Sequence, residues 1–352
     1  MQRYWKYIGF VALLLGASGV LAAEAPIDAQ EAYSPIFLLY SGDPTPARLQ
    51  GLQQFLQSKN ASKEAIKDTV DTVVYKLKHF KAGFAYPVYA SETATTGNSC
   101  VVADSHLSEF KEVVSLLTSA RIYQSVLARR TPTISVQAVL ENVLNHEIFH
   151  CYDLMKVSQT EIGLQVIKHG SAYFSHHGEV GADVFAALVH LRGGGDKQLL
   201  RQIRDFRTLN LLNGDAAHYT ARALDYVLWN YDQRRLKQLN MRQIVELAHT
   251  IRDLTALTPD EFGLYKDASL QLSSEVAILE NSNVNPNAEW LEKLVYTPPP
   301  DPGFLSQLIL QVRAALHNLG GDISPDNTYF YPLMKKFYLP TQFNIIKAEN
   351  TQ

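Results

Sequence analysis

The chain has 352 residues, of which 46% are hydrophobic and 19% charged, and its formal net charge is −3. This composition is typical of a globular protein with a substantial core, in one large domain or two lobes. Charges of both signs are dispersed along the sequence, so no basic stripe indicates binding to nucleic acid.

Residues 1–23 have the pattern of a secretory signal peptide. Arg3 and Lys6 precede an apolar run over residues 8–15, and small residues flank a cleavage site near Ala22 or Ala23. The run is too short to span a bilayer comfortably, and no later segment is long and apolar enough. We therefore expect an exported protein, periplasmic or secreted, without stable membrane insertion after signal cleavage.

The part of the sequence from residue 24 to residue 130 has a mixed pattern, which we interpret as an N-terminal α/β lobe. Its periodicity predicts helices at 46–58, 62–80 and 105–120, and short strands at 83–90 and 99–102. A stretch rich in Ser, Thr, Gly and Asn separates the two strands, as expected of a loop.

The remaining part, 131–352, is predicted to be a helical C-terminal lobe. Helices are expected at 135–156, 178–191, 197–211, 215–230, 241–254, 259–279 and 304–319. The fold class is therefore mainly α (α+β), with a small β-element next to the helix at 135–156.

The sequence contains two cysteines, Cys100 and Cys151. In an oxidising compartment two such thiols often form a disulfide. A disulfide here would join the second predicted strand to the helix at 135–156. Two separate buried thiols are the alternative, because a sequence does not give the Cα separation on which pairing depends.

The helix at 135–156 carries the segment His-Glu-Ile-Phe-His at residues 146–150. Residues four apart lie on one helix face, so His146 and His150 can bind a single Zn²⁺ ion through their imidazoles. Glu147 reaches the rim of that face, where a carboxylate can accept a proton from zinc-bound water. A pair of core or surface histidines without metal is the alternative interpretation.

This segment resembles the HExxH signature of the zincin metallopeptidases. It lacks the extension of the metzincin branch, since Asp153 and Lys156 occupy the positions of its glycine and third histidine. It is more similar to the gluzincin branch, which has a glutamate followed four residues later by an aspartate. Residues 179–183, Glu-Val-Gly-Ala-Asp, match that second motif. The resemblance covers roughly residues 83–230.

The resemblance implies that His146, His150 and Glu179 bind one Zn²⁺ ion per chain, and that Asp183 hydrogen-bonds His146. The spacing agrees, because Glu179 and Asp183 share one helix face and metal-bound histidines usually need an acceptor on their other nitrogen. Competing candidates for the third ligand lie in the intervening segment, which we expect to be a loop: Glu161, His169, His176 and His177.

The resemblance also implies a side chain that stabilises the oxyanion of the reaction. We expect residues 215–219 at the start of a helix, with Asp215 as its N-cap and His218 or Tyr219 presented to the site. Tyr173 is a further candidate, and a capped helix with an incidental histidine is the alternative. The strands at 83–102 are candidates for pairing with an extended substrate, or form a hairpin without that role.

Together these features predict an exported, zinc-dependent metallopeptidase that acts on a peptide or protein substrate. The alternative is a zinc-binding but non-catalytic exported helical interaction protein. A helical binding protein with an accidental motif is a third possibility. The sequence does not determine the oligomeric state.

Overall fold

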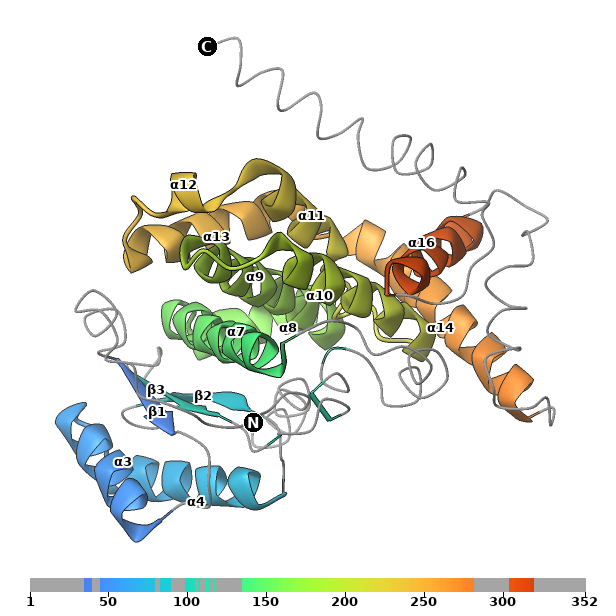
Figure 1. Cartoon of the computed structure of the whole chain (residues 1–352). Coiled ribbons are helices and arrows are strands. Elements are labelled where there is room, and N and C mark those ends of the chain that lie inside the picture. The colour runs from blue at the N-terminus through green and yellow to red at the C-terminus, as the bar shows by residue number, and fades with distance from the viewer. Residues whose placement is uncertain are drawn as a thin grey trace.

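The computed structural model describes residues 35–39, 45–79, 83–89, 99–104, 107, 112–113, 117, 135–281 and 304–319. Within these ranges the chain is mostly helical with one three-stranded sheet, which confirms the predicted mainly α class (Figure 1). The expected signal peptide and most of the helix expected at 105–120 lie outside them. None of the described helices combines the length and hydropathy that a membrane span requires.

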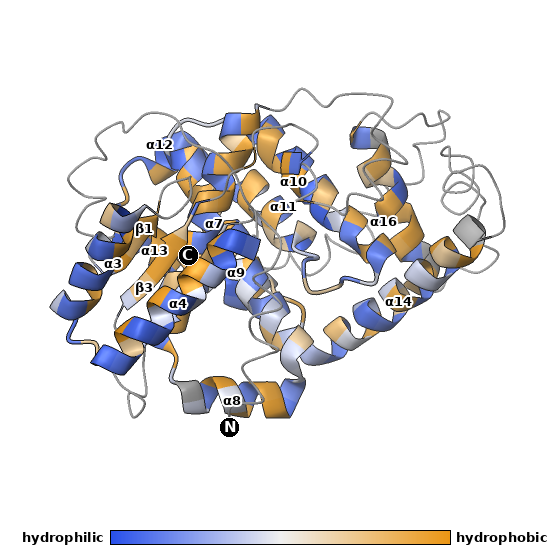
Figure 2. Cartoon of the chain, turned by 90° about the horizontal axis from the view of Figure 1, so that it is seen from below, coloured by the Kyte–Doolittle hydropathy of each residue, from blue (hydrophilic) through white to orange (hydrophobic). Residues whose placement is uncertain are grey.

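The sheet has the strand order β1-β3-β2. Strand β1 (Ile36–Leu39) runs parallel to β3 (Ser99–Ala103), and β2 (Phe84–Val88) runs antiparallel to it. The sequence did not predict β1, since four consecutive apolar residues show no periodicity. The strands are largely hydrophobic because both faces of the sheet are covered (Figure 2).

Among the described strands, β2 lies at the edge of the sheet, so one side of its backbone is a free edge there. The amides of Cys100 and Asp104 donate to carbonyl groups at either end of the β1 strand, at 2.9 and 2.8 Å, so the even-numbered amides of β3 point toward β1. Hydrogen-bonding groups alternate along a strand, and the register then pairs the even-numbered residues of β2 with β3. Ala85 and Pro87 therefore direct their backbone groups away from the sheet, the side on which a strand tolerates proline.

Two layers of helix enclose the sheet (Figure 1). Helices α3 (Pro46–Ser58) and α4 (Lys63–His79) cover one face, where they pack with Phe84 and Val101. Helix α7 (Val136–Lys156) lies on the other face, where Ala85 and Val102 join the main core. A disulfide between Cys100 and Cys151 joins β3 to α7, with their Cα atoms 5.7 Å apart.

The remaining helices form the larger part of the molecule: α8 (Gln159–His169), α9 (Ser171–Arg192), α10 (Lys197–Leu209), α11 (Ala221–Asn230), α12 (Gln233–Leu236), α13 (Met241–Thr255), α14 (Pro259–Asn281) and α16 (Phe304–Asn318). Helix α9 is central and buried along most of its length, with apolar residues on every side. A Cβ atom at Gly181 would clash with the ring of Phe149, so this glycine allows α7 and α9 to pack closely.

Two expectations for this part of the chain are wrong. Helix α8 occupies much of the segment that we expected to be a loop, beginning after Ser158, whose hydroxyl caps it. Helix α11 begins after Thr220 rather than at Asp215. The chain first makes a turn at Gly214, whose φ of +76° favours glycine, and Asp215 uses its carboxylate within that turn rather than as a helix cap.

Candidate metal centre

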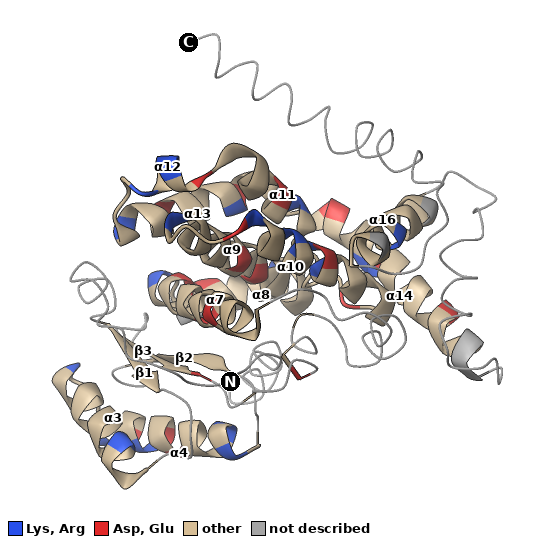
Figure 3. Ribbon diagram, viewed as in Figure 1, with Lys and Arg blue, Asp and Glu red and all other residues tan. Residues whose placement is uncertain are grey.

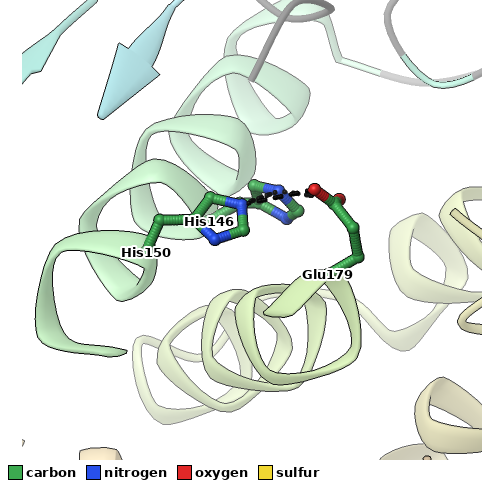
Figure 4. Close-up of side chains that lie close together, drawn as sticks. All are labelled: His146, His150 and Glu179. Carbon is green, nitrogen blue, oxygen red and sulfur yellow. Dashed lines mark hydrogen bonds and ion pairs between the residues drawn. The ribbon is translucent and has the colours of Figure 1, made fainter. Parts of the chain in front are cut away.

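Helices α7 and α9 bring together three potential metal ligands, His146, His150 and Glu179 (Figure 4). His146 and Glu179 are buried and His150 is partly buried. One ligand atom from each residue lies within 4.8 Å of the other two. In the described part of the chain, this is the group of three side chains that could hold a metal ion.

The distances between the ligand atoms fit a single zinc ion. Nε2 of His146 lies 3.0 Å from Nε2 of His150 and 3.3 Å from Oε2 of Glu179. Nε2 of His150 lies 3.5 Å from Oε1 of Glu179. A tetrahedral zinc ion with ligands at about 2.0–2.1 Å requires about 3.3 Å between ligand atoms. The separations of 3.0–3.5 Å, with one oxygen of Glu179 facing each histidine, are therefore of the size that a single tetrahedral zinc ion requires.

Asp183 determines how His146 is oriented. It lies one turn after Glu179 on α9, and its Oδ1 is 2.7 Å from Nδ1 of His146. This hydrogen bond places a proton on Nδ1 and leaves the lone pair of Nε2 directed at the other two ligands. Burial alone would lower the pKa of His146, but the carboxylates of Glu179 and Asp183 outweigh it and raise the pKa to about 10. The two carboxylates thus favour positive charge at this ring, which a metal ion bound to Nε2 would supply in place of a second proton.

Two buried carboxylate oxygens also fit a bound cation. Oε2 of Glu147 and Oε2 of Glu179 have no hydrogen-bond partner within the described residues, although both side chains are buried. The Glu179 atom lies 3.3–3.7 Å from nitrogen atoms of His146, Arg207 and His218 without making a hydrogen bond. A buried carboxylate without a partner is costly. A divalent cation and its water would satisfy both atoms, so the residues present fit a metal.

Arg207 is a part of the site that the sequence analysis missed. Its side chain is 2% exposed, and its Nε and one terminal nitrogen donate to the two oxygens of Asp183 at 2.8 Å. Thr220 donates a further hydrogen bond to Asp183. Burial would raise the pKa of Asp183, but Arg207 and His146 hold it far below its usual range. Asp183 therefore stays ionised and keeps His146 in place.

A signal for Arg207 does exist in the sequence. In α10 the apolar residues Leu200 and Ile203 and the charged residue Arg207 lie at helical spacing on one face, and all three are buried. A charged residue within an apolar stripe indicates a buried partner elsewhere in the chain. The identity of that partner, Asp183, does not follow from the pattern.

The net charge of the side chains around the three ligands favours a bound divalent cation. Glu147 lies on α7, Glu179 and Asp183 lie on α9, and Arg207 lies on α10. Figure 3 shows acidic residues in red on both α7 and α9. With His146 and His150 neutral, as metal ligands are, these side chains carry three negative charges and one positive charge in a largely buried region. One divalent cation balances the two negative charges in excess.

His218 lies beside the three ligands, in the turn before α11. Its Nε2 is 3.5 Å from Oε2 of Glu179, and its Nδ1 is 2.7 Å from Oδ2 of Asp215. Burial would lower the pKa of His218, but Glu179 and Asp215 raise it. Asp215 fixes the ring so that a protonated Nε2 points at the site, where it can donate a hydrogen bond. His218 is one of the two residues predicted for this position, and Asp215, predicted to cap a helix, holds the ring of His218 instead.

The other candidate donors point elsewhere. The hydroxyl of Tyr219 donates to Oε1 of Gln311 on α16 at 2.7 Å, and its ring stacks on Tyr265. The ring of Tyr173 packs against Phe262, with centroids 5.7 Å apart. The structure therefore brings His218, and not these tyrosines, to Glu179.

The four competing ligands are not part of the metal group either. His176 is buried, and its ring donates from Nδ1 to the carbonyl of Ala217 and accepts at Nε2 from the amide of Leu257, both at 3.2 Å. Burial lowers its pKa to about 4, so the ring is a neutral core residue. The others lie elsewhere on the surface: His177 faces Asp253, His169 packs on Tyr173, and Glu161 is exposed on α8.

No family model matches this sequence, and no curated protein or solved structure matches it. A function for the chain has to follow from the chemistry of its own residues.

Proposed function

We propose that the chain is an exported, zinc-dependent metallopeptidase of the zincin type. The observation that carries the proposal is the convergence of His146, His150 and Glu179 at zinc-like separations. Glu147 follows His146 directly in the chain and is also buried. The HExxH helix and the Glu-x-x-x-Asp helix are the two elements that meet there. The disulfide and the signal-peptide pattern support export, because disulfides persist in oxidising compartments.

The proposed reaction is hydrolysis of a peptide bond. Zinc held by the three ligands would lower the pKa of a bound water toward neutrality and polarise the scissile carbonyl. Glu147 takes the proton of the attacking water and delivers it to the leaving amine. His218 donates from Nε2 to the developing oxyanion, and Asp215 holds its ring in the orientation that this requires.

The free edge of β2 is the proposed binding element for an extended substrate. Ala85 offers an outward amide and carbonyl, and Pro87 offers a carbonyl but no amide. A peptide chain could therefore add to the sheet as a fourth strand next to β2. Because β2 contacts α7, main-chain pairing at this edge holds a substrate near the helix that carries Glu147.

The first experiment is the metal content of the purified protein, measured by elemental mass spectrometry under mild chelation. We expect about one zinc ion per chain, as a single site of this type requires. His150→Ala should lose the zinc while it stays folded, because two remaining ligands hold zinc poorly. His169→Ala, a histidine outside the ligand group, is the matched control and should keep it. A folded wild-type protein without zinc after reconstitution would contradict the proposal.

A further inference from the structure

Lys76 occupies an unusual position next to the proposed substrate strand. It lies on α4 and is partly buried. Its ammonium is 4.8 Å from the ring centroid of Phe84 and 5.6 Å from that of Tyr86, both on β2. Such contacts are cation–π interactions, in which the ring faces attract the positive charge. Two residues of the strand thus form an aromatic platform under one ammonium group.

The ammonium of Lys76 has no carboxylate partner among the described residues. Its positive charge interacts electrostatically with Glu147. Burial lowers the pKa of Lys76, and the negative charge of Glu147 partly offsets this by raising it. Helix α4 and helix α7 contact β2 from its two faces. An ammonium on this platform is therefore within electrostatic reach of the proposed catalytic base.

A substrate that pairs with β2 would bring its side chains to this platform. Tyr86 and Phe84 direct their side chains to the α4 face of the sheet, where they join the smaller core. A residue directly opposite another on the neighbouring strand shares its face, with Cβ atoms about 4.5–5.5 Å apart. The substrate residue opposite Tyr86 therefore presents its side chain toward Lys76.

We propose that Lys76 binds a carboxylate of the peptide substrate and makes the enzyme selective for peptides that are acidic at this position. The inference rests on the proposed peptidase function. A partly desolvated ammonium that has no carboxylate partner among the described residues gains more from a charge-assisted hydrogen bond than a solvated one does. The carboxylate belongs either to a Glu or Asp side chain or to the substrate C-terminus, and these two sources are distinguishable.

The test measures peptide binding to the zinc-loaded full chain in a Glu147→Gln background, so that substrates are not consumed. Short amidated peptides carry one Glu at each position in turn, and each has a matched Gln peptide. A third set carries Gln with a free C-terminal carboxylate. We expect one Glu position, or the free C-terminus, to improve the Kd about tenfold over its neutral counterpart. Lys76→Gln should abolish that preference and Lys76→Arg should keep it.

Lys78→Gln, an exposed lysine of the same helix, is the matched control and should keep the preference. A preference unchanged by Lys76→Gln, or lost equally in Lys78→Gln, overturns the role of Lys76. Cleavage by the wild-type chain separates the two proposals. Cleavage without Lys76-dependent selectivity overturns the carboxylate site alone, and Lys76-dependent binding without any cleavage overturns the peptidase function alone. If none of the peptides binds to any of these protein variants, both proposals are overturned.

Discussion

Glu147→Gln is expected to retain zinc and to lose peptide hydrolysis by about 10²–10⁴-fold, the usual contribution of a general acid–base group. The amide has the same shape as the carboxylate but does not accept the proton of the attacking water. Glu147 is not one of the three ligands, so the metal should remain. The measurement is the turnover of a peptide pool at equal zinc occupancy.

Glu141→Gln is the control for this prediction, since Glu141 is an exposed residue of the same helix. It should leave turnover unchanged. Full activity of the zinc-loaded Glu147→Gln protein would rule out the proposed mechanism. If wild type and variant both bind zinc and neither cleaves any peptide, the chain is the non-catalytic zinc-binding protein of the alternative interpretation.

Arg207→Met is expected to lower the free energy of unfolding by about 3–5 kcal/mol, because removal of one partner of a buried ion pair leaves the other charge uncompensated. Asp183 would keep its contacts to His146 and Thr220 but lose both hydrogen bonds from the guanidinium. Zinc affinity should fall as well, since Asp183 positions His146. Denaturant unfolding of the zinc-free protein measures the free energy of unfolding, and competition with a chelator measures the zinc affinity.

Arg201→Met provides the comparison, because Arg201 is exposed on the same helix and should cost little. The double variant Arg207→Met with Asp183→Asn removes both buried charges and should recover part of the loss. Equal stability of the Arg207 and Arg201 variants would show that the ion pair contributes nothing to the fold.

Strongly periodic segments were the part of the fold that the sequence predicted well. Helix α3 has the predicted bounds, and α7 begins within one residue of its prediction, because each presents an apolar face and a clear N-cap residue, Thr45 or Ser135. Strand β1 was missed because it is too short for a pattern. Helix α8 was missed because it is short and has no clear apolar face: Ile162 is buried, but Leu164 and Ile167 are exposed.

The candidate metal ligands were predictable because their spacing is local: a histidine pair one turn apart, and a Glu–Asp pair one turn apart on another helix. The supporting groups were not. Arg207 and Thr220 reach Asp183 from other elements, and Lys76 reaches β2 across a helix–sheet contact. Such contacts depend on packing between segments far apart in the chain, which periodicity does not report.

The disulfide between β3 and α7 gives the chain a particular covalent topology. Cys100 and Cys151 are 51 positions apart, and the ring that they close contains His146, Glu147 and His150. A single nick anywhere within that ring leaves two fragments that remain linked through the sulfur atoms. The fragment with the sheet, whose β2 edge we propose to bind substrate, and the fragment with the later helices would then separate only after the disulfide is reduced. Cutting the backbone between them is not enough to separate these parts of the chain.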